Sequence, residues 1–263
     1  MAEKKLRGVS EAFKKDGTKY YRTSITYKSK HISLGSYDSP FTANQAYWEG
    51  AILLTKKEMS IKDYNSDKIL DYKKWIILIN FRDNDIYITA PIYLYPNYFE
   101  YHLGPNNILK FSIDDLFYFS KKQIMQRGRH FFVADYGMQV NILNRYGIKN
   151  YGVEGRDFIF KNKDNMDFRY ENIKILNRFH GVTSHTFKSG TKYTARIHIN
   201  GNYTIGKYSS EIEAAIAYNK AIDILKTRGL NKNFTPNYIE ELAPSEYANI
   251  YSNVKISEKI LNY

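Results

Sequence analysis

The stretch of sequence that decides the fold is KSGTKYTARIHINGNYTIGKYSSEIEAAIAYNKAIDIL, residues 188–225. Apolar and polar residues alternate from Tyr193 to Ile199, which is the period of a strand that is buried on one face and open on the other. Residues 200–202, Asn-Gly-Asn, predict a tight turn because both residue types tolerate positive φ. The alternation resumes at Tyr203, so we expect a second strand paired with the first.

A helix is predicted directly after these strands. Ser210 with Glu213 three residues later is the pattern of a capping box. Apolar residues then recur every three or four positions over 214–221, and Gly229 predicts the end of the helix.

About 50 residues of this pattern occur twice, which indicates a duplicated structural unit. The offset between matching segments falls from 173 to 171, as two one-residue loop differences would produce. Ser39-Pro40 opens the corresponding helix of the first copy, with proline at its first position. We expect a ββα or βββα unit in each copy. The matching segments are 6–9 with 179–182, 15–20 with 188–193, 21–25 with 193–197, 34–37 with 205–208, and Ala43, Ala46 and Tyr47 with Ala214, Ala217 and Tyr218.

Both copies resemble the ethylene-response-factor (Apetala-two) type DNA-binding domain of plant transcription factors, which also occurs in bacterial and phage homing endonucleases. The family reads Arg-Gly-Val, Trp-x-Ala-x-Ile, Leu-Gly-x-Phe, Ala-Ala-x-Ala-Tyr and a late Asn-Phe. Tyrosine replaces the strand tryptophan in both copies. The corresponding residues here are Arg7-Gly8-Val9 or Gly181-Val182, Tyr193-x-Ala195-x-Ile197, Leu34-Gly35-x-Tyr37, Ala214-Ala215-x-Ala217-Tyr218 and Asn233-Phe234.

The resemblance implies a three-stranded sheet that lies in the DNA major groove, with the helix packed behind it. Arginine and asparagine would read base edges there, while lysines and hydroxyls would hold phosphates. The alternative for each of these residues is that it lies on a solvent-exposed sheet face and does not contact DNA. Candidate DNA-binding residues are Arg7, Arg22, Ser24, Thr26, Lys28, Lys30 and His31 in the first copy, and Arg196, His198, Asn200 and Thr204 in the second, with Arg178, Lys188 and Lys192 nearer the DNA backbone.

Residues 60–177 carry their own apolar clusters and form a domain rather than a linker. Asp167-x-Arg169-x-Glu171-Asn172 resembles the end of HNH homing endonucleases, and residues 113–117 and 138–143 resemble the upstream part of that domain. Aligned on this motif, the catalytic positions of the family lack the required side chains. The family's Asp-His pair falls on Ile159-Phe160, its metal-binding Asn on Phe168 and its upstream His near Val140, unless a longer insertion makes His130 that residue.

Phenylalanine can neither activate water nor bind a metal, so the resemblance implies a nuclease domain without its chemistry. Arg169, Glu171 and Asn172 are then expected to be structural, at a helix terminus. His102 and His130 are the remaining candidates for a site with Asp114, Asp135 or Asp164, although isolated histidines are more often surface or packing residues. The basic group Lys121, Lys122, Arg127 and Arg129 either tracks the DNA backbone or is simply solvated.

Composition narrows the function classes further. Lys and Arg total 39 against 27 Asp and Glu, giving a formal charge of +12, which favours a polyanionic partner. The absence of cysteine excludes disulfides, cysteine-ligated zinc and cysteine nucleophiles. The sequence has no phosphate-binding Gly-x-x-x-x-Gly-Lys loop, no His-Glu-x-x-His and no Gly-x-Ser-x-Gly. No apolar run approaches a membrane span, and the first residues do not resemble a signal peptide, so an intracellular protein is expected.

The sequence therefore predicts an α+β protein in which two sheet-plus-helix DNA-binding modules flank a central domain of HNH type. The predicted parts are 1–59, 60–177, 178–238 and a tail, 239–263, whose apolar pattern would dock on the body or on a partner. The predicted function is sequence-specific binding of duplex DNA at a bipartite site, as a regulator derived from a homing endonuclease. We expect no catalytic residues, cofactor or metal, a monomer, and a cytoplasmic, nucleoid-associated location in a bacterium or phage-infected cell. The alternatives are an active HNH nuclease, or a phage-encoded inhibitor whose tyrosine-rich middle binds another protein.

Overall fold

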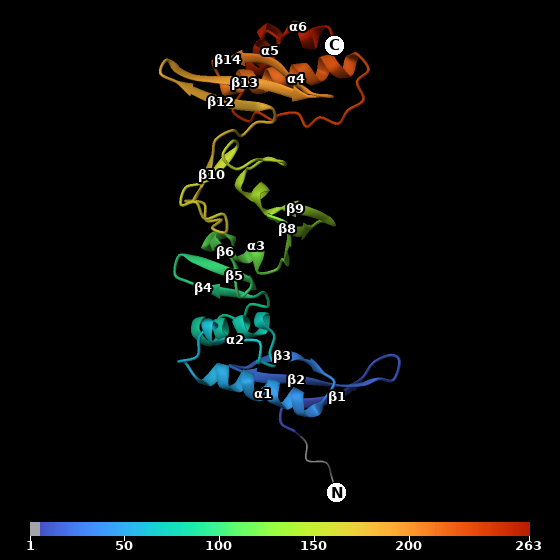
Figure 1. Cartoon of the computed structure of the whole chain (residues 1–263), viewed down its shortest axis with the longest axis vertical. Coiled ribbons are helices and arrows are strands. Elements are labelled where there is room, and N and C mark those ends of the chain that lie inside the picture. Colours follow the sequence, from blue (N-terminus) through green and yellow to red (C-terminus); the bar gives the residue numbers. More distant parts are fainter. Residues whose placement is uncertain (1–5) are drawn as a thin grey trace. The chain divides into compact units, whose positions relative to one another are not determined.

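The computed structural model describes residues 6–263 and has the predicted α+β fold, with several small three-stranded sheets and separate helices (Figure 1). The chain divides into two compact units. The first runs to Gln139 and includes Asn165–Tyr170, and the second consists of Val140–Asp164 and Glu171–Tyr263. Each predicted module lies in a different unit, so the two are described separately.

The first module has the predicted order of three strands and a helix. Its middle strand alternates as expected, and the residues that face inward pack against the helix. The core of the module is built on Ile32, Leu34, Ala46 and Leu53, all at most 2% exposed. Its elements are β1 (Val9–Phe13), β2 (Lys19–Tyr27), β3 (Lys30–Tyr37) and α1 (Pro40–Thr55), with Ser39 as the N-cap and Pro40 in the first turn.

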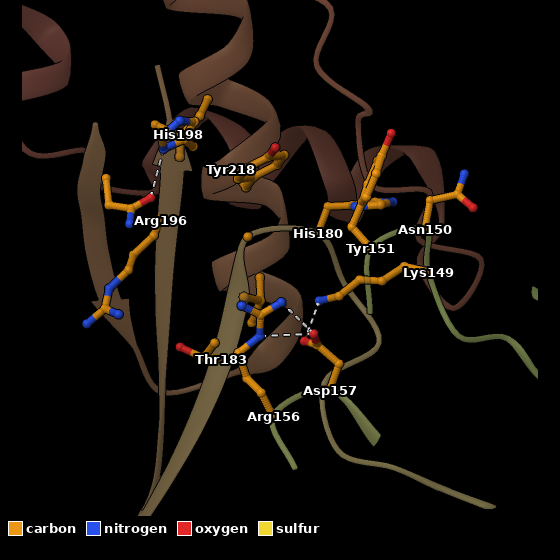
Figure 2. Close-up of a pocket in the computed structure, with 14 residues that line it drawn as sticks. Lys149, Asn150, Tyr151, Arg156, Asp157, His180, Thr183, Arg196, His198 and Tyr218 are labelled. Carbon is orange, nitrogen blue, oxygen red and sulfur yellow. Dashed lines mark hydrogen bonds and ion pairs between the residues drawn. The ribbon is translucent and has the colours of Figure 1, made fainter. Parts of the chain in front are cut away.

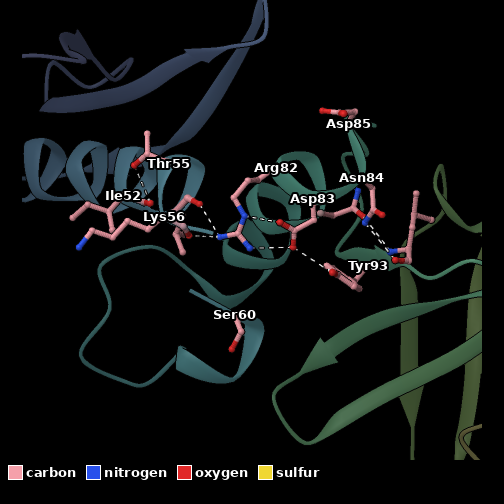
Figure 3. A network of polar contacts seen from close by, with 12 residues as sticks. Ile52, Thr55, Lys56, Ser60, Arg82, Asp83, Asn84, Asp85 and Tyr93 are labelled. Atoms are coloured by element: carbon pink, nitrogen blue, oxygen red, sulfur yellow. Dashed lines mark hydrogen bonds and ion pairs between the residues drawn. The ribbon is translucent and has the colours of Figure 1, made fainter. Parts of the chain in front are cut away.

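Helix α2 (Tyr72–Asn84) extends the core of the first module beyond the predicted boundary at residue 59. Trp75 and Leu78 of α2 are buried in the same cluster as Leu53 of α1. Arg82 reinforces this contact, because its Nη1 donates to the carbonyls of Leu53 (3.0 Å) and Lys56 (2.7 Å) at the C-terminal end of α1 (Figure 3). Helix ends leave such carbonyls without intrahelical donors, so the buried guanidinium completes the end of α1.

The rest of the first unit consists of short strands around an aromatic core. Phe99, Phe111 and Phe119 are fully buried there, with the Phe111 and Phe119 rings 4.1 Å apart. The strands are β4 (Ile92–Leu94), β5 (Tyr98–Gly104), β6 (Asn107–Ser112), β7 (Ile124–Arg127), β8 (His130–Asp135) and β9 (Met138–Asn141), with the short helix α3 (Leu116–Phe119) between β6 and β7; the last two residues of β9 already belong to the second unit.

The second unit begins with a short 3-10 helix (Ile142–Tyr146) and a pair of short strands, and then repeats the three-strand and helix pattern. Ala195, Ile197 and Ile199 are buried as the alternation predicted, and Ser210 with Glu213 forms the predicted capping box. The elements are β10 (Phe158–Phe160), β11 (Ile173–Ile175), β12 (Val182–Phe187), β13 (Gly190–His198), β14 (Asn202–Tyr208) and α4 (Glu211–Thr227).

The two modules share local details that confirm the duplication. The β2–β3 register shifts between Thr23 and Ser24, and the β13–β14 register shifts at the matching place, between Ala195 and Arg196. Gly8 packs under the ring of Tyr47, and Gly181 packs in the same way under Tyr218. The repeated Gly-Val and Ala-Tyr motifs are therefore one contact, made once in each module.

The C-terminal segment docks on the second module, which decides between the two alternatives left by the sequence. Helices α5 (Pro244–Asn253) and α6 (Glu258–Leu261) both contact α4. Ile260 is fully buried, and Ile250, Val254 and Ile256 pack against the same core. The segment also lies along β14, where the Ser257 amide donates to the Ile205 carbonyl at 2.8 Å.

Candidate nucleic-acid interface

The sheet of the first module has one face covered by α1 and one open face. The register places Arg22 between Ser10 and Ser36, Ser24 beside Ser33, and Thr26 beside His31. These cross-strand partners share a face because directly opposite residues point to the same side of a sheet. We call this set the first face: Ser10, Arg22, Ser24, Thr26, His31, Ser33 and Ser36.

Arg22, Ser24, Thr26 and His31 are thus brought together as predicted, whereas three predicted cations lie elsewhere. Lys28, in the β2–β3 turn, forms an ion pair with Asp85. Lys30 lies 5.2 Å over the ring of Tyr87. Arg7 lies over the rings of Tyr47 and Trp48 of α1, with both centroids within 5.8 Å. All three contact the protein itself and lie outside the first face.

The sheet of the second module presents a second face. Arg196 pairs with Thr204, His198 with Asn202, and Thr194 with both Thr183 and Lys207. Lys192, predicted near the DNA backbone, pairs with His185 on the same side. The second face is defined as Thr183, His185, Lys192, Thr194, Arg196, His198, Asn202, Thr204 and Lys207.

The other residues predicted for the second module lie outside this face. Lys188 is in the β12–β13 turn, and Asn200 is in the β13–β14 turn, where it accepts a hydrogen bond from the Tyr203 hydroxyl at 3.0 Å. Arg178 is held by the protein, because its guanidinium pairs with Glu211 (3.0 Å) and with Glu241.

Register identifies face residues that the sequence prediction missed. Ser10, Ser33 and Ser36 complete the first face, and Thr183, His185, Thr194, Asn202 and Lys207 complete the second. The turn residues between the strands were the available signal, since turn length sets which residues lie opposite one another. Thr194 was expected to be open to solvent but is only 3% exposed, because it lies on the central strand between Thr183 and Lys207.

A cleft of about 310 Å³ lies beside the second face, between the β12–β13 edge and residues 149–157 (Figure 2). Arg156 and Arg196 both line this cleft and the neighbouring one of about 400 Å³. His180 also lines the first cleft, and burial, followed by the nearby Lys149 ammonium, lowers its pKa. The pKa of His180 is thus below its usual value, and the cationic side chains that line the cleft are Lys149, Arg156 and Arg196.

Asp157 organises this edge of the module. It is 1% exposed and accepts hydrogen bonds from the Val153 amide (2.8 Å) and from Arg156 (Nη2, 2.6 Å). Lys149 pairs with its other oxygen at 3.0 Å and also donates to the Phe179 carbonyl at 2.6 Å. Buried charge is tolerated only with such partners, so this cluster fixes the segment that carries Arg156 against the second module.

The positions aligned with HNH catalytic residues lie in strands and packed cores. Ile159 and Phe160 belong to β10, and Phe160 is 6% exposed. Phe168 is 3% exposed, with its ring 5.6 Å from that of Phe111. Val140 is half-buried in β9.

The predicted helix terminus around Arg169 and Asn172 is wrong, because the described chain from 161 to 172 forms turns between β10 and β11. Local polar residues replace helical hydrogen bonds there. Asp167, 1% exposed, accepts from Arg169 Nε at 2.9 Å and Nη2 at 2.7 Å. Asn172 accepts from the Asn162 amide at 2.9 Å. The motif residues Arg169 and Asn172 therefore have structural contacts, as expected.

The two histidines considered for a residual catalytic or metal site differ in their surroundings. His102 is buried, with Nδ1 2.9 Å from the Tyr72 hydroxyl and Nε2 3.5 Å from Glu100. His130 is exposed beside the β7–β8 turn. Among residues 6–263, no group of three or more His, Asp or Glu side chains is arranged to hold a metal ion. His102 contacts Tyr72 and Glu100 and not Asp114, Asp135 or Asp164, the carboxylates of the less favoured alternative.

No helix within the described residues is long and apolar enough to cross a lipid bilayer. Comparisons with protein-family models, with curated proteins and with solved structures each find no match to this chain.

Proposed function

We propose that this protein binds duplex DNA sequence-specifically at a bipartite site, one half for each module, and acts as a transcriptional regulator that represses by occupancy. The observation that carries the proposal is that each sheet has one face covered by a helix and one open polar face, with hydroxyl groups and Arg22 on the first, and hydroxyl groups, Asn202, Lys192, Arg196 and Lys207 on the second. The major groove admits a β-sheet, and these side-chain types read base edges and hold phosphates. The formal charge of +12 favours the same partner.

The proposal includes descent from an HNH homing endonuclease that lost catalysis, and a cytoplasmic, nucleoid-associated location in a bacterium or phage-infected cell. Support for the descent comes from the two positions where the family has a catalytic or metal-binding group, Phe160 and Phe168, which serve as core residues. Two DNA-binding modules in one chain remove the usual reason for a DNA-binding protein to dimerise, so the proposed form is a monomer.

The test is a selection of duplexes from a randomised library in magnesium near physiological salt, with sequencing of both the enriched sites and their ends. Two enriched half-sites at fixed spacing with intact ends are expected. Cut ends would replace the proposal with an active nuclease. Enrichment of nothing, with weak and salt-sensitive binding, would point to a protein partner, since counterion release alone would then drive association.

Replacing Arg196 with alanine is expected to weaken binding to the selected site by about 1–3 kcal/mol and to relax the base preference under that residue. The reason is that Arg196 is exposed on the second face, and no hydrogen bond or ion pair holds its side chain among the described residues. Fluorescence anisotropy with the selected duplex and a scrambled duplex, at one salt concentration, measures both effects.

The matched control is Arg228→Ala, which removes an exposed arginine at the C-cap of α4, on the helix that covers the opposite side of the sheet. It should change binding to the two duplexes equally and slightly. Equal losses for Arg196→Ala and Arg228→Ala would show that only net charge matters and would remove the second face from the proposal.

A further inference from the structure

We infer that the two modules read different half-sites, so that the DNA site is asymmetric and the protein binds it in one direction. The inference rests on the proposed function and concerns which DNA that function recognises. Its basis is that the two faces share one backbone arrangement, including the matching register shifts, yet carry different side chains at nearly every equivalent position.

The shared register allows a position-by-position comparison. Arg22, between two serines on the first face, corresponds to Thr194, which lies beside Lys207 on the second. Ser24 on the first face corresponds to Arg196 on the second. At the next position along the strands, Thr26 with His31 corresponds to His198 with Asn202. Only the residues that face inward are alike in the two copies, since Thr23 and Ile25 correspond to Ala195 and Ile197.

The arginine in particular is displaced. It stands two residues further along the middle strand in the second module than in the first, which is about 7 Å at the rise of an extended strand. Base pairs follow one another every 3.4 Å or so, and the commonest arginine contact in the major groove is with guanine. A guanine read by Arg196 would therefore sit about two base pairs away from the place where Arg22 reads one in its own half-site.

The charges of the two faces differ as well. Arg22 is the single permanent cation on the first face, beside four serines. The second face carries Lys192, Arg196 and Lys207, and Arg156 lines the adjacent cleft. Phosphate contacts set the salt dependence of binding, so the second half-site should contribute most of that dependence, and the first should rely on hydroxyl groups.

The double variant Arg22→Thr with Ser24→Arg tests this inference. It gives the first face the arginine position of the second and leaves the net charge unchanged. Library selection is run with the wild-type chain, with this variant, and with Arg22→Ser and Arg196→Ser. A thermal melt of each protein establishes that it is folded, and the single variants change exposed residues only.

Two different half-sites are expected for the wild-type chain. The double variant should bind the wild-type site about 5- to 150-fold more weakly, the effect of losing one base-reading arginine, and should select a changed first half with an unchanged second half. Arg22→Ser should relax one half only, and Arg196→Ser the other. Two identical half-sites, or the same selected sequence from the double variant, would overturn this inference and leave the proposed function standing. Failure of the wild-type chain to enrich any sequence would overturn the proposed function itself.

Discussion

Replacing Gly8 with alanine is expected to cost about 2–5 kcal/mol of folding stability, measured as the change in the free energy of unfolding in urea. Gly8 has φ of +75°, which costs an L-residue about 1–2 kcal/mol. A Cβ at this position would also overlap the ring of Tyr47, and overpacking of this kind costs about 1–3 kcal/mol more. Tyr47 is on the buried side of α1, so its ring cannot simply swing into solvent.

Gly17→Ala provides a matched control in the same module. Its φ of +84° is similar, but nothing lies within 4 Å of where its Cβ would stand. Gly17→Ala should therefore show the backbone cost alone, about 1–2 kcal/mol. The same contrast is expected in the second module between Gly181, under Tyr218, and Gly229, which faces open space at φ +87°. Equal losses of folding stability within each pair would mean that the glycine–tyrosine contact does not contribute to the stability of its module.

Replacing Asp157 with alanine is expected to destabilise the second unit by about 3–5 kcal/mol, the usual effect of removing one partner from a buried ion pair. Lys149 would be left with 8% of its side chain exposed and without its counter-charge, and the Val153 amide would lose its acceptor. Urea unfolding followed by tryptophan fluorescence would miss this event, because Trp48 and Trp75 lie in the first unit. Hydrogen exchange of residues 190–225 reports on the second unit directly.

The control is Glu241→Ala, which breaks an ion pair in the same unit whose two side chains are 42% and 46% exposed. Exposed pairs contribute little because water and salt screen them, and Arg178 keeps Glu211 as a partner. Glu241→Ala should therefore change stability far less than Asp157→Ala. If the two variants lose stability equally, the Asp157 cluster does not stabilise the packing of residues 149–157 against the second module.

The Asp157 cluster also predicts that the folding stability of the second unit falls in acid. Burial on its own would raise the pKa of Asp157, but hydrogen bonds from Arg156, the Val153 amide and Lys149 outweigh it and lower the pKa. A carboxyl whose folded pKa is below its unfolded value of about 3.9 stabilises fully above that value and loses this contribution as pH falls through the folded pKa. Asp157→Asn should remove this part of the pH dependence, leaving a flatter stability profile below about pH 5.

The sequence alone determined the duplication, the strand and helix order of each module, and the middle-strand residues on each open face. The alternation over residues 193–199 and the Ser210–Glu213 box are local signals, and the structure follows them except at Thr194, which is buried. Local signals suffice here because period, capping and turn chemistry act within a few residues. The glycine of each Gly-Val motif was also visible in the sequence, but its partner was not, since Tyr47 lies 39 residues after Gly8.

Only the tertiary structure decided which cations are available to a ligand. Lys28, Lys30 and Arg178 read as DNA contacts in the sequence, yet Asp85, Tyr87 and Glu211 engage them from distant parts of the chain. Conversely, Lys207 joins the second face only through its cross-strand partner Thr194. Pairing across strands and between distant segments depends on how the whole chain packs, and no short stretch of sequence contains that information. For this protein, the sequence determined the two modules, and packing determined what each module presents.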